Sequence, residues 1–284
     1  MYQQNSEMFD ANKWPSTHII TLIKLYTVVF GYFNFHHLLQ TKHTTSYKTE
    51  VSQSDKMIQI ISFLTLFGLL IANYVSATWP KTSNDQVSGV HTTHHGAHEA
   101  GACELPKSSY AISYSVALGN IESLKHLKFR SELCGHVIQI DCGNGPLDVV
   151  ITNSNLGGGL DLYASTWKRL TNGMSPGVTS CSAKLSTRNA FNFNGPRCYY
   201  KPDSPADNEY YRNVGLLNTN GRIVTSATID NRSGEHRGTN PFFAFDFGRP
   251  ISVDKQVVFT FEGGETHAVH LRDCEYQANK QMWS

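Results

Sequence analysis

Short runs in which hydrophobic and polar residues alternate are spaced along the chain from about residue 109 onward. Residues 137–141 (VIQID) and 147–152 (LDVVIT) alternate in this way and are rich in β-branched side chains, which is typical of strands. The pair Asn144-Gly145 predicts a tight turn between these two runs. Three further segments are predicted: a strand or short helix over 109–121, a helical turn or loop over 123–129, and a closing strand over 177–185.

A glycine-rich loop follows the second of these runs, and an acidic residue follows the loop. The three adjacent glycines at 157–159 predict a sharp bend or a close approach of the backbone to another group. Asp161 then stands where the N-cap or first turn of a helix is expected. Leu162, Trp167 and Leu170 are spaced to give that helix one apolar side. We expect Trp167 to pack in the core, whereas Tyr163 fits either the core or a groove.

The sequence after about residue 190 is punctuated by turn residues. They separate four β-rich runs: 222–229 (RIVTSATI), 241–247 (PFFAFDF), 255–261 (KQVVFTF) and 266–271 (THAVHL). This spacing is typical of an antiparallel β-sandwich. Residues 198–213 (CYYKPDSPADNEYYRN) are interpreted as a linker whose tyrosines either stack on sugars or pack between domains.

The N-terminal part of the chain carries a predicted signal peptide at 57–77. Lys56 gives the basic flank, residues 58–72 form an apolar run, and Val75-Ser76-Ala77 gives a small-residue cleavage site. Residues 1–56 are then an upstream extension that is not part of the mature protein. The alternative is that residues 1–56 are retained and that an apolar run anchors the chain in a membrane.

Four histidines follow a polar linker at 78–89. On a strand, His91 and His95 share one face while His94 and His98 share the other, so the four do not converge. We therefore predict no metal site and no cofactor.

Cysteine usage and charge narrow the class of protein. All six cysteines lie at or after Cys103, behind the hydrophobic N-terminal region, which indicates a secreted, disulfide-bonded protein. The alternative is six buried thiols in a cytosolic protein. The net charge of +1 gives no electrostatic reason to expect nucleic acid or an anionic membrane as a partner. Asn231-Arg232-Ser233 is an N-glycosylation sequon in a predicted turn.

Three motifs occur in a familiar order between residues 90 and 185. They are Thr93-His94-His95-Gly96 with Gly101-Ala102-Cys103 after it, Cys134-Gly135 with Cys142, and Leu160-Asp161-Leu162 with Trp167. The set resembles the double-psi β-barrel of the expansin-like superfamily, which includes barwin, loosenins and rare-lipoprotein-A-like proteins. The resemblance implies an all-β fold, with a six-stranded double-psi β-barrel over 90–186 and a β-sandwich over 190–284. In expansins the second domain binds polysaccharide.

The resemblance also implies a pairing of the cysteines. Cys103 is expected to pair with Cys134, and the remaining cysteines then pair most simply as Cys142–Cys181 and Cys198–Cys274. Six cysteines allow fifteen pairings, so the spacing by itself does not decide among them.

For function, the resemblance implies a secreted monomer that binds and loosens cell-wall polysaccharide (chitin, cellulose or β-glucan) without hydrolysis. Its groove would contain Thr93, His95, Asn153, Asp161 and Tyr163, with Asp161 in the acid position. The chain departs from expansins at Thr152-Asn153-Ser154-Asn155, where they carry Thr-Asp-x-Asn, so an amide replaces the second acid.

Two other functions stay open. A weak lytic or hydrolytic enzyme would use Asp161 as its acid, but inverting hydrolysis also needs a base, and Asn153 cannot act as one. The first-strand region offers His94, His95, Glu99 and Glu104 instead. The second alternative is a protease inhibitor or effector-type defence protein on the same barrel. Asp161 would also be explained by a simple helix cap.

Overall fold

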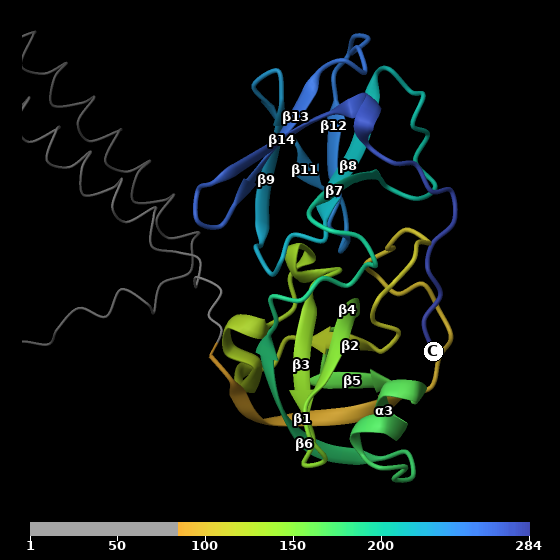
Figure 1. The fold of residues 1–284 in the computed structure, drawn as a ribbon, viewed down its shortest axis with the longest axis vertical. Coiled ribbons are helices and arrows are strands. Elements are labelled where there is room, and N and C mark those ends of the chain that lie inside the picture. The colour runs from red at the N-terminus through yellow and green to blue at the C-terminus, as the bar shows by residue number, and fades with distance from the viewer. Residues whose placement is uncertain (1–84) are drawn as a thin grey trace, which may run out of the picture. The chain divides into compact units, whose positions relative to one another are not determined.

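The computed structural model describes residues 85–284 (Figure 1). The upstream extension, the expected signal peptide and the first part of the linker lie outside the described residues. Among residues 85–284, no helix has the length and apolar character needed to cross a membrane. The first strand begins at Val87, so the last three residues of the expected linker, 87–89, belong to the barrel.

The first part of the described chain forms a closed six-stranded barrel. Its strands are β1 (Val87–His95), β2 (Ser115–Gly119), β3 (Val137–Asp141), β4 (Leu147–Asn155), β5 (Leu160–Tyr163) and β6 (Val178–Leu185). Their order around the barrel is β1-β5-β2-β4-β3-β6. The pairs β1–β5 and β2–β4 are parallel, and the others are antiparallel. This arrangement confirms the predicted six-stranded double-psi β-barrel.

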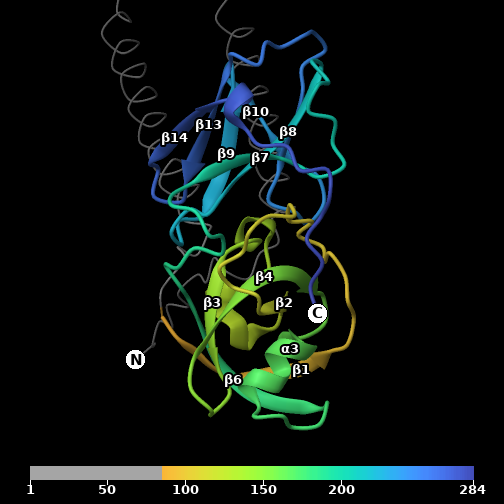
Figure 2. The same ribbon diagram turned by 45° about the vertical axis from the view of Figure 1, so that its right-hand side comes forward.

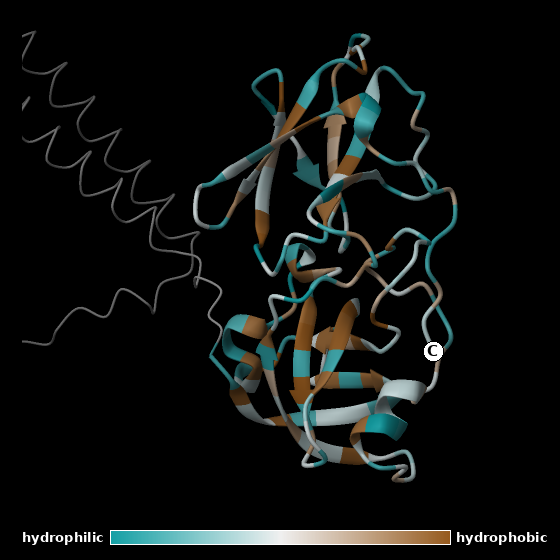
Figure 3. Ribbon diagram, viewed as in Figure 1, coloured by the Kyte–Doolittle hydropathy of each residue, from teal (hydrophilic) through white to brown (hydrophobic). Residues whose placement is uncertain are grey.

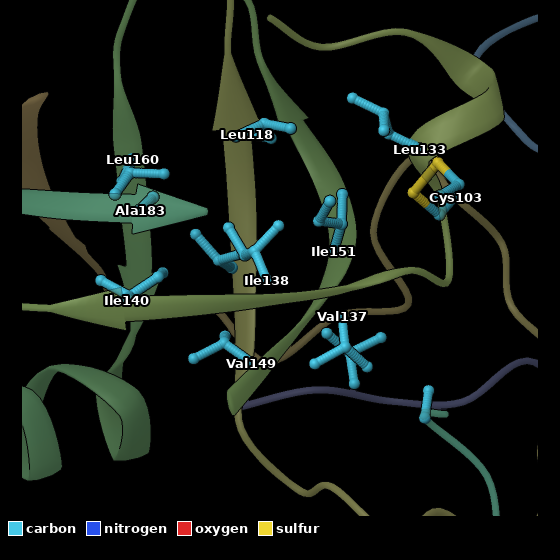
Figure 4. Close-up of a cluster of buried hydrophobic side chains, with 14 of the residues drawn as sticks. Cys103, Leu118, Leu133, Val137, Ile138, Ile140, Val149, Ile151, Leu160 and Ala183 are labelled. Carbon is cyan, nitrogen blue, oxygen red and sulfur yellow. A yellow bond between two sulfur atoms is a disulfide. The ribbon is translucent and has the colours of Figure 1, made fainter. Parts of the chain in front are cut away.

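The alternation in the sequence accounts for the barrel core. In β3, Val137, Ile138 and Ile140 are buried, while Gln139 and Asp141 keep some exposed surface. Brown, hydrophobic segments run along β3 and β4 (Figure 3). Figure 4 shows side chains from several strands meeting in one cluster, among them Leu118, Ile138, Ile140, Val149, Ile151 and Leu160. Burying this apolar surface is the main source of barrel stability.

The short helices lie between the barrel strands. They are the 3₁₀ segments η2 (Glu122–Leu127) and η3 (Ser131–Leu133) and the α-helix α3 (Ala164–Leu170). The glycine loop before β5 has a steric reason, because a Cβ at Gly159 would clash with the carbonyl oxygen of His91. A close backbone approach was one of the two explanations predicted for these glycines.

The predicted helix begins three residues later than expected. Asp161 lies inside strand β5, and α3 begins only at Ala164, so the prediction of Asp161 as a helix cap is wrong. The reason is tertiary, since β5 pairs with both β1 and β2 and those ladders hold residues 160–163 extended. Trp167 is buried as predicted, and its indole N–H donates to the carbonyl of Met174 at 2.8 Å.

The second part of the chain forms two four-stranded antiparallel sheets, as predicted. The strands are β7 (Arg197–Tyr200), β8 (Tyr211–Leu217), β9 (Val224–Ile229), β10 (Arg232–Ser233), β11 (Glu235–His236), β12 (Phe243–Asp246), β13 (Gln256–Phe261) and β14 (Thr266–His270). One sheet has the order β10-β9-β13-β14 and the other β11-β12-β8-β7. Their shared core contains Phe243, Phe245, Phe259 and Phe261.

The interpretation of residues 198–213 as a linker is wrong. Cys198, Tyr199 and Tyr200 belong to β7, and the segment ends inside β8. Tyr199 and Tyr200 are buried, so neither ring is available for stacking on a sugar, whereas Tyr210 is exposed. Nearly all residues of β7 and β8 are buried, so no two-residue alternation marks these strands in the sequence.

The last nine residues, 276–284, leave the sandwich, after Glu275 has paired with β7. After the 3₁₀ segment η4 (Leu271–Asp273), the chain returns to the barrel, where Trp283 pairs with Glu99 and Lys280 pairs with Pro106. Figures 1 and 2 both show the end marked C beside α3. The second domain, expected to be 190–284, therefore contributes its final segment to the first.

Three disulfides join the pairs that the resemblance implied. Cys103–Cys134 and Cys142–Cys181 lie in the barrel part of the chain, and Cys198–Cys274 closes the sandwich. The sequon residue Asn231 is exposed in the turn between β9 and β10.

Candidate functional site

The parallel pairing of β1 with β5 brings four of the proposed site residues together. Thr93 lies opposite Asp161, and His95 lies opposite Tyr163. Residues two apart on a strand share a face, so Thr93 and His95 point to the same side of β1. The Thr93 hydroxyl donates to Asp161 Oδ1 at 2.6 Å, and His95 Nδ1 lies 3.1 Å from Asp161 Oδ2. The Asp161 carboxylate is therefore held at both oxygens.

Glu99 provides a second carboxylate beside this group. Its Oε1 lies 3.1 Å from His95 Nε2, and it accepts hydrogen bonds from Asn153 Nδ2 at 2.5 Å and from the Tyr163 hydroxyl at 3.2 Å. The two carboxylates thus contact opposite nitrogens of one imidazole ring. A neutral ring donates to one of them, and an imidazolium ion donates to both.

Asn153 is fixed by hydrogen bonds at both ends of its amide. Its Oδ1 accepts from the backbone N–H groups of Ala102 and Ser154 at 2.8 and 2.9 Å. Its Nδ2 donates to Glu99 and lies 3.3 Å from the Tyr163 hydroxyl. A carboxylate at position 153 could not donate to Glu99 and would add a like charge beside it. This donor role gives a physical reason for an amide where expansins carry an acid.

Tyr163 packs against the buried side of the site. Its side chain is buried, and its ring packs edge-on against His95 with the centroids 4.5 Å apart. Burial raises the pKa of Tyr163 to about 12; the Glu99 charge adds to the rise, and the hydrogen bond from Asn153 opposes it. The hydroxyl therefore stays protonated and serves as a donor. Of the two places predicted for Tyr163, the core and a groove, the structure shows the core, because the ring is covered.

The part of the site that faces solvent is polar. The exposed fraction of the side chain is 19% for Asp161, 22% for His95 and 40% for Glu99. This surface combines two carboxylates with an imidazole, and all three are held in place by other side chains. It can accept hydrogen bonds from hydroxyl groups of a ligand.

The other candidate residues of the first-strand region lie elsewhere. The His94 ring packs edge-on against Trp167 with the centroids 5.8 Å apart. Glu104 forms ion pairs with Lys201 at 2.7 Å and Lys280 at 2.6 Å. Burial by itself would raise the pKa of Glu104, but the two ammonium groups outweigh it and hold the pKa below its ordinary value. Within residues 85–284, no group of three or more His, Cys, Asp or Glu side chains is arranged to hold a metal ion.

Of the two loop acids, only Glu99 belongs to the site. The sequence named it as an option, but nothing in its neighbourhood distinguished it from Glu104. The one local signal is its position four residues after His95.

The sandwich presents a different surface. Outward positions of β9, β13 and β14 carry polar and aliphatic side chains and one imidazole: Ser226, Thr228, Gln256, Val258, Thr260, Thr266, Ala268 and His270. The phenylalanines of these strands, Phe259 and Phe261, point into the core. These three strands therefore offer no Phe, Tyr or Trp ring for stacking on a sugar.

Comparisons with known proteins give the following. No family model and no curated protein matches the chain. Among solved structures, the chain is similar to a mutant of the Clavibacter michiganensis expansin in complex with cellohexaose, with 14% identity and a TM-score of 0.49 over 70% of this chain and 95% of that one. It is also similar to the apo form of that expansin, with 16% identity and a TM-score of 0.47 over the same shares of the two chains.

Proposed function

We propose that this protein is secreted and that its barrel binds cell-wall polysaccharide without hydrolysing it. The observation that carries the proposal is the Asp161 carboxylate, which Thr93 and His95 fix at both oxygens while its edge stays open to solvent. Chitin, cellulose and β-glucan are the candidate polymers.

The chemistry of the site suits sugar hydroxyls. Hydrogen bonds from hydroxyl groups to an ionised carboxylate are shorter and stronger than those between neutral groups. The side chains of Thr93, His95 and Asn153 already hold the two carboxylates in place, so little conformational entropy is lost when a ligand binds. The groove residues proposed from the sequence therefore divide into two kinds. Asp161 and His95 face the ligand, Thr93 and Tyr163 position these two, and Asn153 positions Glu99.

Binding is favoured over hydrolysis because of how Glu99 is used. An inverting glycosidase needs one carboxylic acid to protonate the leaving oxygen and one free carboxylate to activate water. Glu99 Oε1 already accepts from Asn153 and Tyr163 and contacts His95. Oε1 is therefore occupied by these contacts, so a general base at this position would have to use the other carboxylate oxygen, Oε2.

Glycan cleavage remains the second candidate function, and one observation favours it. Glu99 supplies the second carboxylate that the sequence did not assign, and it lies across the His95 ring from Asp161. In that function Asp161 would be the acid and Glu99 the base.

The experiment is a pull-down on insoluble chitin, cellulose and β-glucan with wild type, Asp161→Ala and Asp246→Ala. Asp246 is the matched control because it is an exposed aspartate on β12 of the sandwich. We expect Asp161→Ala to bind about tenfold more weakly and Asp246→Ala to bind like wild type. Equal binding by all three would remove Asp161 from the site. If wild type releases reducing sugar and Asp161→Ala does not, the function of the barrel would be glycan cleavage and not binding alone.

A further inference from the structure

The final segment of the chain, residues 276–284, pairs through residues 279–283 with the loop that carries Glu99. We call this segment the tail and residues 96–107 the Glu99 loop. The N–H of Trp283 donates to the carbonyl of Glu99 at 2.8 Å, and the N–H of Glu99 donates to the carbonyl of Trp283 at 3.1 Å. Two more backbone hydrogen bonds follow, from Gln281 to Leu105 at 2.8 Å and from Lys107 to Asn279 at 2.9 Å. The tail thus adds a strand-like edge to the loop.

Side chains fix the tail at both ends. Lys280 forms ion pairs with Glu104 at 2.6 Å and with Asp203 at 2.7 Å. The ring of Trp283 is buried and packs edge-on against Tyr110, with the centroids 4.9 Å apart. The Ser165 hydroxyl, on α3, donates to the carbonyl of Ser284 at 2.5 Å. The tail therefore spans from the sandwich to the helix that follows β5.

Glu99 differs from the other site residues in what supports it. Thr93 and His95 lie on β1, Asn153 lies on β4, and Asp161 and Tyr163 lie on β5, so the barrel holds them. Glu99 lies in a loop, and both of its backbone hydrogen bonds are made with Trp283. Its position against His95, Asn153 and Tyr163 therefore depends on the tail.

We propose that the tail is a positioning element of the glycan site and that Trp283 is the positioning residue that holds Glu99 in place. Glu99 in turn fixes His95, which contacts Asp161. This inference rests on the proposed function for its binding readout only, because the coupling between Trp283 and Glu99 is a property of the fold.

The indole of Trp283 offers a matched pair of variants. Its N–H is buried and has no hydrogen-bond partner among residues 85–284. Trp283→Phe therefore removes no hydrogen bond and keeps an aromatic ring against Tyr110, whereas Trp283→Ala removes the packing. A positioning role through the ring predicts that phenylalanine rescues what alanine loses.

The binding test uses whichever of chitin, cellulose and β-glucan retains wild type best. We expect Trp283→Ala to bind about tenfold more weakly and Trp283→Phe to recover most of that loss. Because Trp283 acts through Glu99, the double variant Trp283→Ala/Glu99→Ala is expected to bind no more weakly than Glu99→Ala. Additive losses, or wild-type binding by Trp283→Ala, would overturn the inference.

A second readout needs no glycan. Hydrogen exchange at the Glu99 amide is expected to be about tenfold faster in Trp283→Ala, while amides of β3 keep wild-type protection. If Trp283→Ala does not fold, Gln281→Pro takes its place, since it deletes the N–H donated to Leu105 and, besides that, the exposed side-chain hydrogen bond to the carbonyl of Met282. Unchanged exchange at Glu99 would contradict the role of the tail. Wild type retained by none of the three polymers would refute the proposed function, and exchange at Glu99 would then decide the inference.

Discussion

The barrel and the sandwich bury their cores in the same way but differ in how they use polar side chains. In the sandwich, Arg212 is the most deeply buried charged residue, and its guanidinium donates to the carbonyls of Ala206, Asn208 and Ile251. Every one of these contacts holds the sandwich's own loops. In the barrel, Asp161 is also held at both of its carboxylate oxygens, but its side chain stays partly exposed to solvent.

The difference in how the two parts use polar side chains indicates where a ligand site can form. A rigid sheet face is available on both parts, and the sandwich also carries solvent-exposed ion pairs such as Lys255–Asp230 and Arg272–Asp254. The barrel differs because two carboxylates, held by other side chains and still reached by solvent, contact one imidazole ring. The outward face of β9, β13 and β14 has the rigidity without such groups. This contrast supports the proposal that the barrel binds the glycan and that the tail helps to position its site.

Removal of a disulfide should change the stability more than any other variant proposed here, and each disulfide is expected to stabilise the part that contains it. Cys198–Cys274 joins residues 76 apart in the sandwich, and Cys142–Cys181 joins residues 39 apart in the barrel. In the loop-entropy model, removing them costs about 4.5 and about 4 kcal/mol respectively. Cys198→Ser/Cys274→Ser is expected to lower the free energy of unfolding by that larger amount, measured by denaturant titration.

Hydrogen exchange locates the loss. In Cys198→Ser/Cys274→Ser, amides of β8 and β13 are expected to exchange faster while those of β3 and β4 stay protected. Cys142→Ser/Cys181→Ser is the matched control and should show the opposite pattern. Equal exchange in both parts would mean that barrel and sandwich unfold as one unit.

The second prediction concerns the loss of stability at acidic pH, which we expect mainly in the barrel. Burial, followed by the charge of Arg130, lowers the pKa of His136 to about 4. The unfolded chain takes up this proton near pH 6.5, so between about pH 6.5 and 4 the unfolded state holds more protons and stability falls as the pH falls. The full shift corresponds to about 3 kcal/mol. His136 keeps some exposed surface in a crevice that it shares with Leu216 and Leu217, so we expect a smaller loss.

A matched pair of histidines tests this account. Burial, followed by the charge of Arg222, also lowers the pKa of His267 on β14, which is less deeply buried than His136. The loss of unfolding free energy between pH 7 and pH 4.5 should shrink clearly in His136→Gln and much less in His267→Gln. A profile that His136→Gln leaves unchanged would assign the acid sensitivity to other groups.

Local patterns were enough to predict most of the fold. Residues 137–141, 147–152 and 255–261 form strands because their alternation matches one buried and one exposed face. The ordered motifs led to the barrel, to the disulfide pairs and to Thr93, His95 and Asp161. The predictions that were wrong concern residues whose conformation depends on neighbours that are distant in the sequence. Asp161 is extended because β1 and β2 flank β5.

Glu99 shows the limit most clearly. Its partners are His95, nearby in sequence, and Asn153, Tyr163 and Trp283, which are distant. No periodicity or turn signal connects a loop acid with a tryptophan at the far end of the chain. A site residue that is held by a returning segment therefore has to be found from the structure.

The smallest expected effect tests the amide in the barrel site, where Asn153 donates to Glu99 at 2.5 Å. Asn153→Asp restores the acid that expansins carry, but it removes that donor and sets two carboxylates against each other. We expect the free energy of unfolding to fall by about 2 kcal/mol at pH 7, because a partly buried hydrogen bond is lost and like charges repel. Asn194→Asp, at an exposed position, is the matched control and should be neutral.

The loss of stability in Asn153→Asp should be smaller at pH 4, where a protonated aspartic acid can donate to Glu99 as the amide does. A stable Asn153→Asp variant that also releases reducing sugar would show that the amide had been suppressing cleavage, and the barrel would then be better described as a disabled hydrolase.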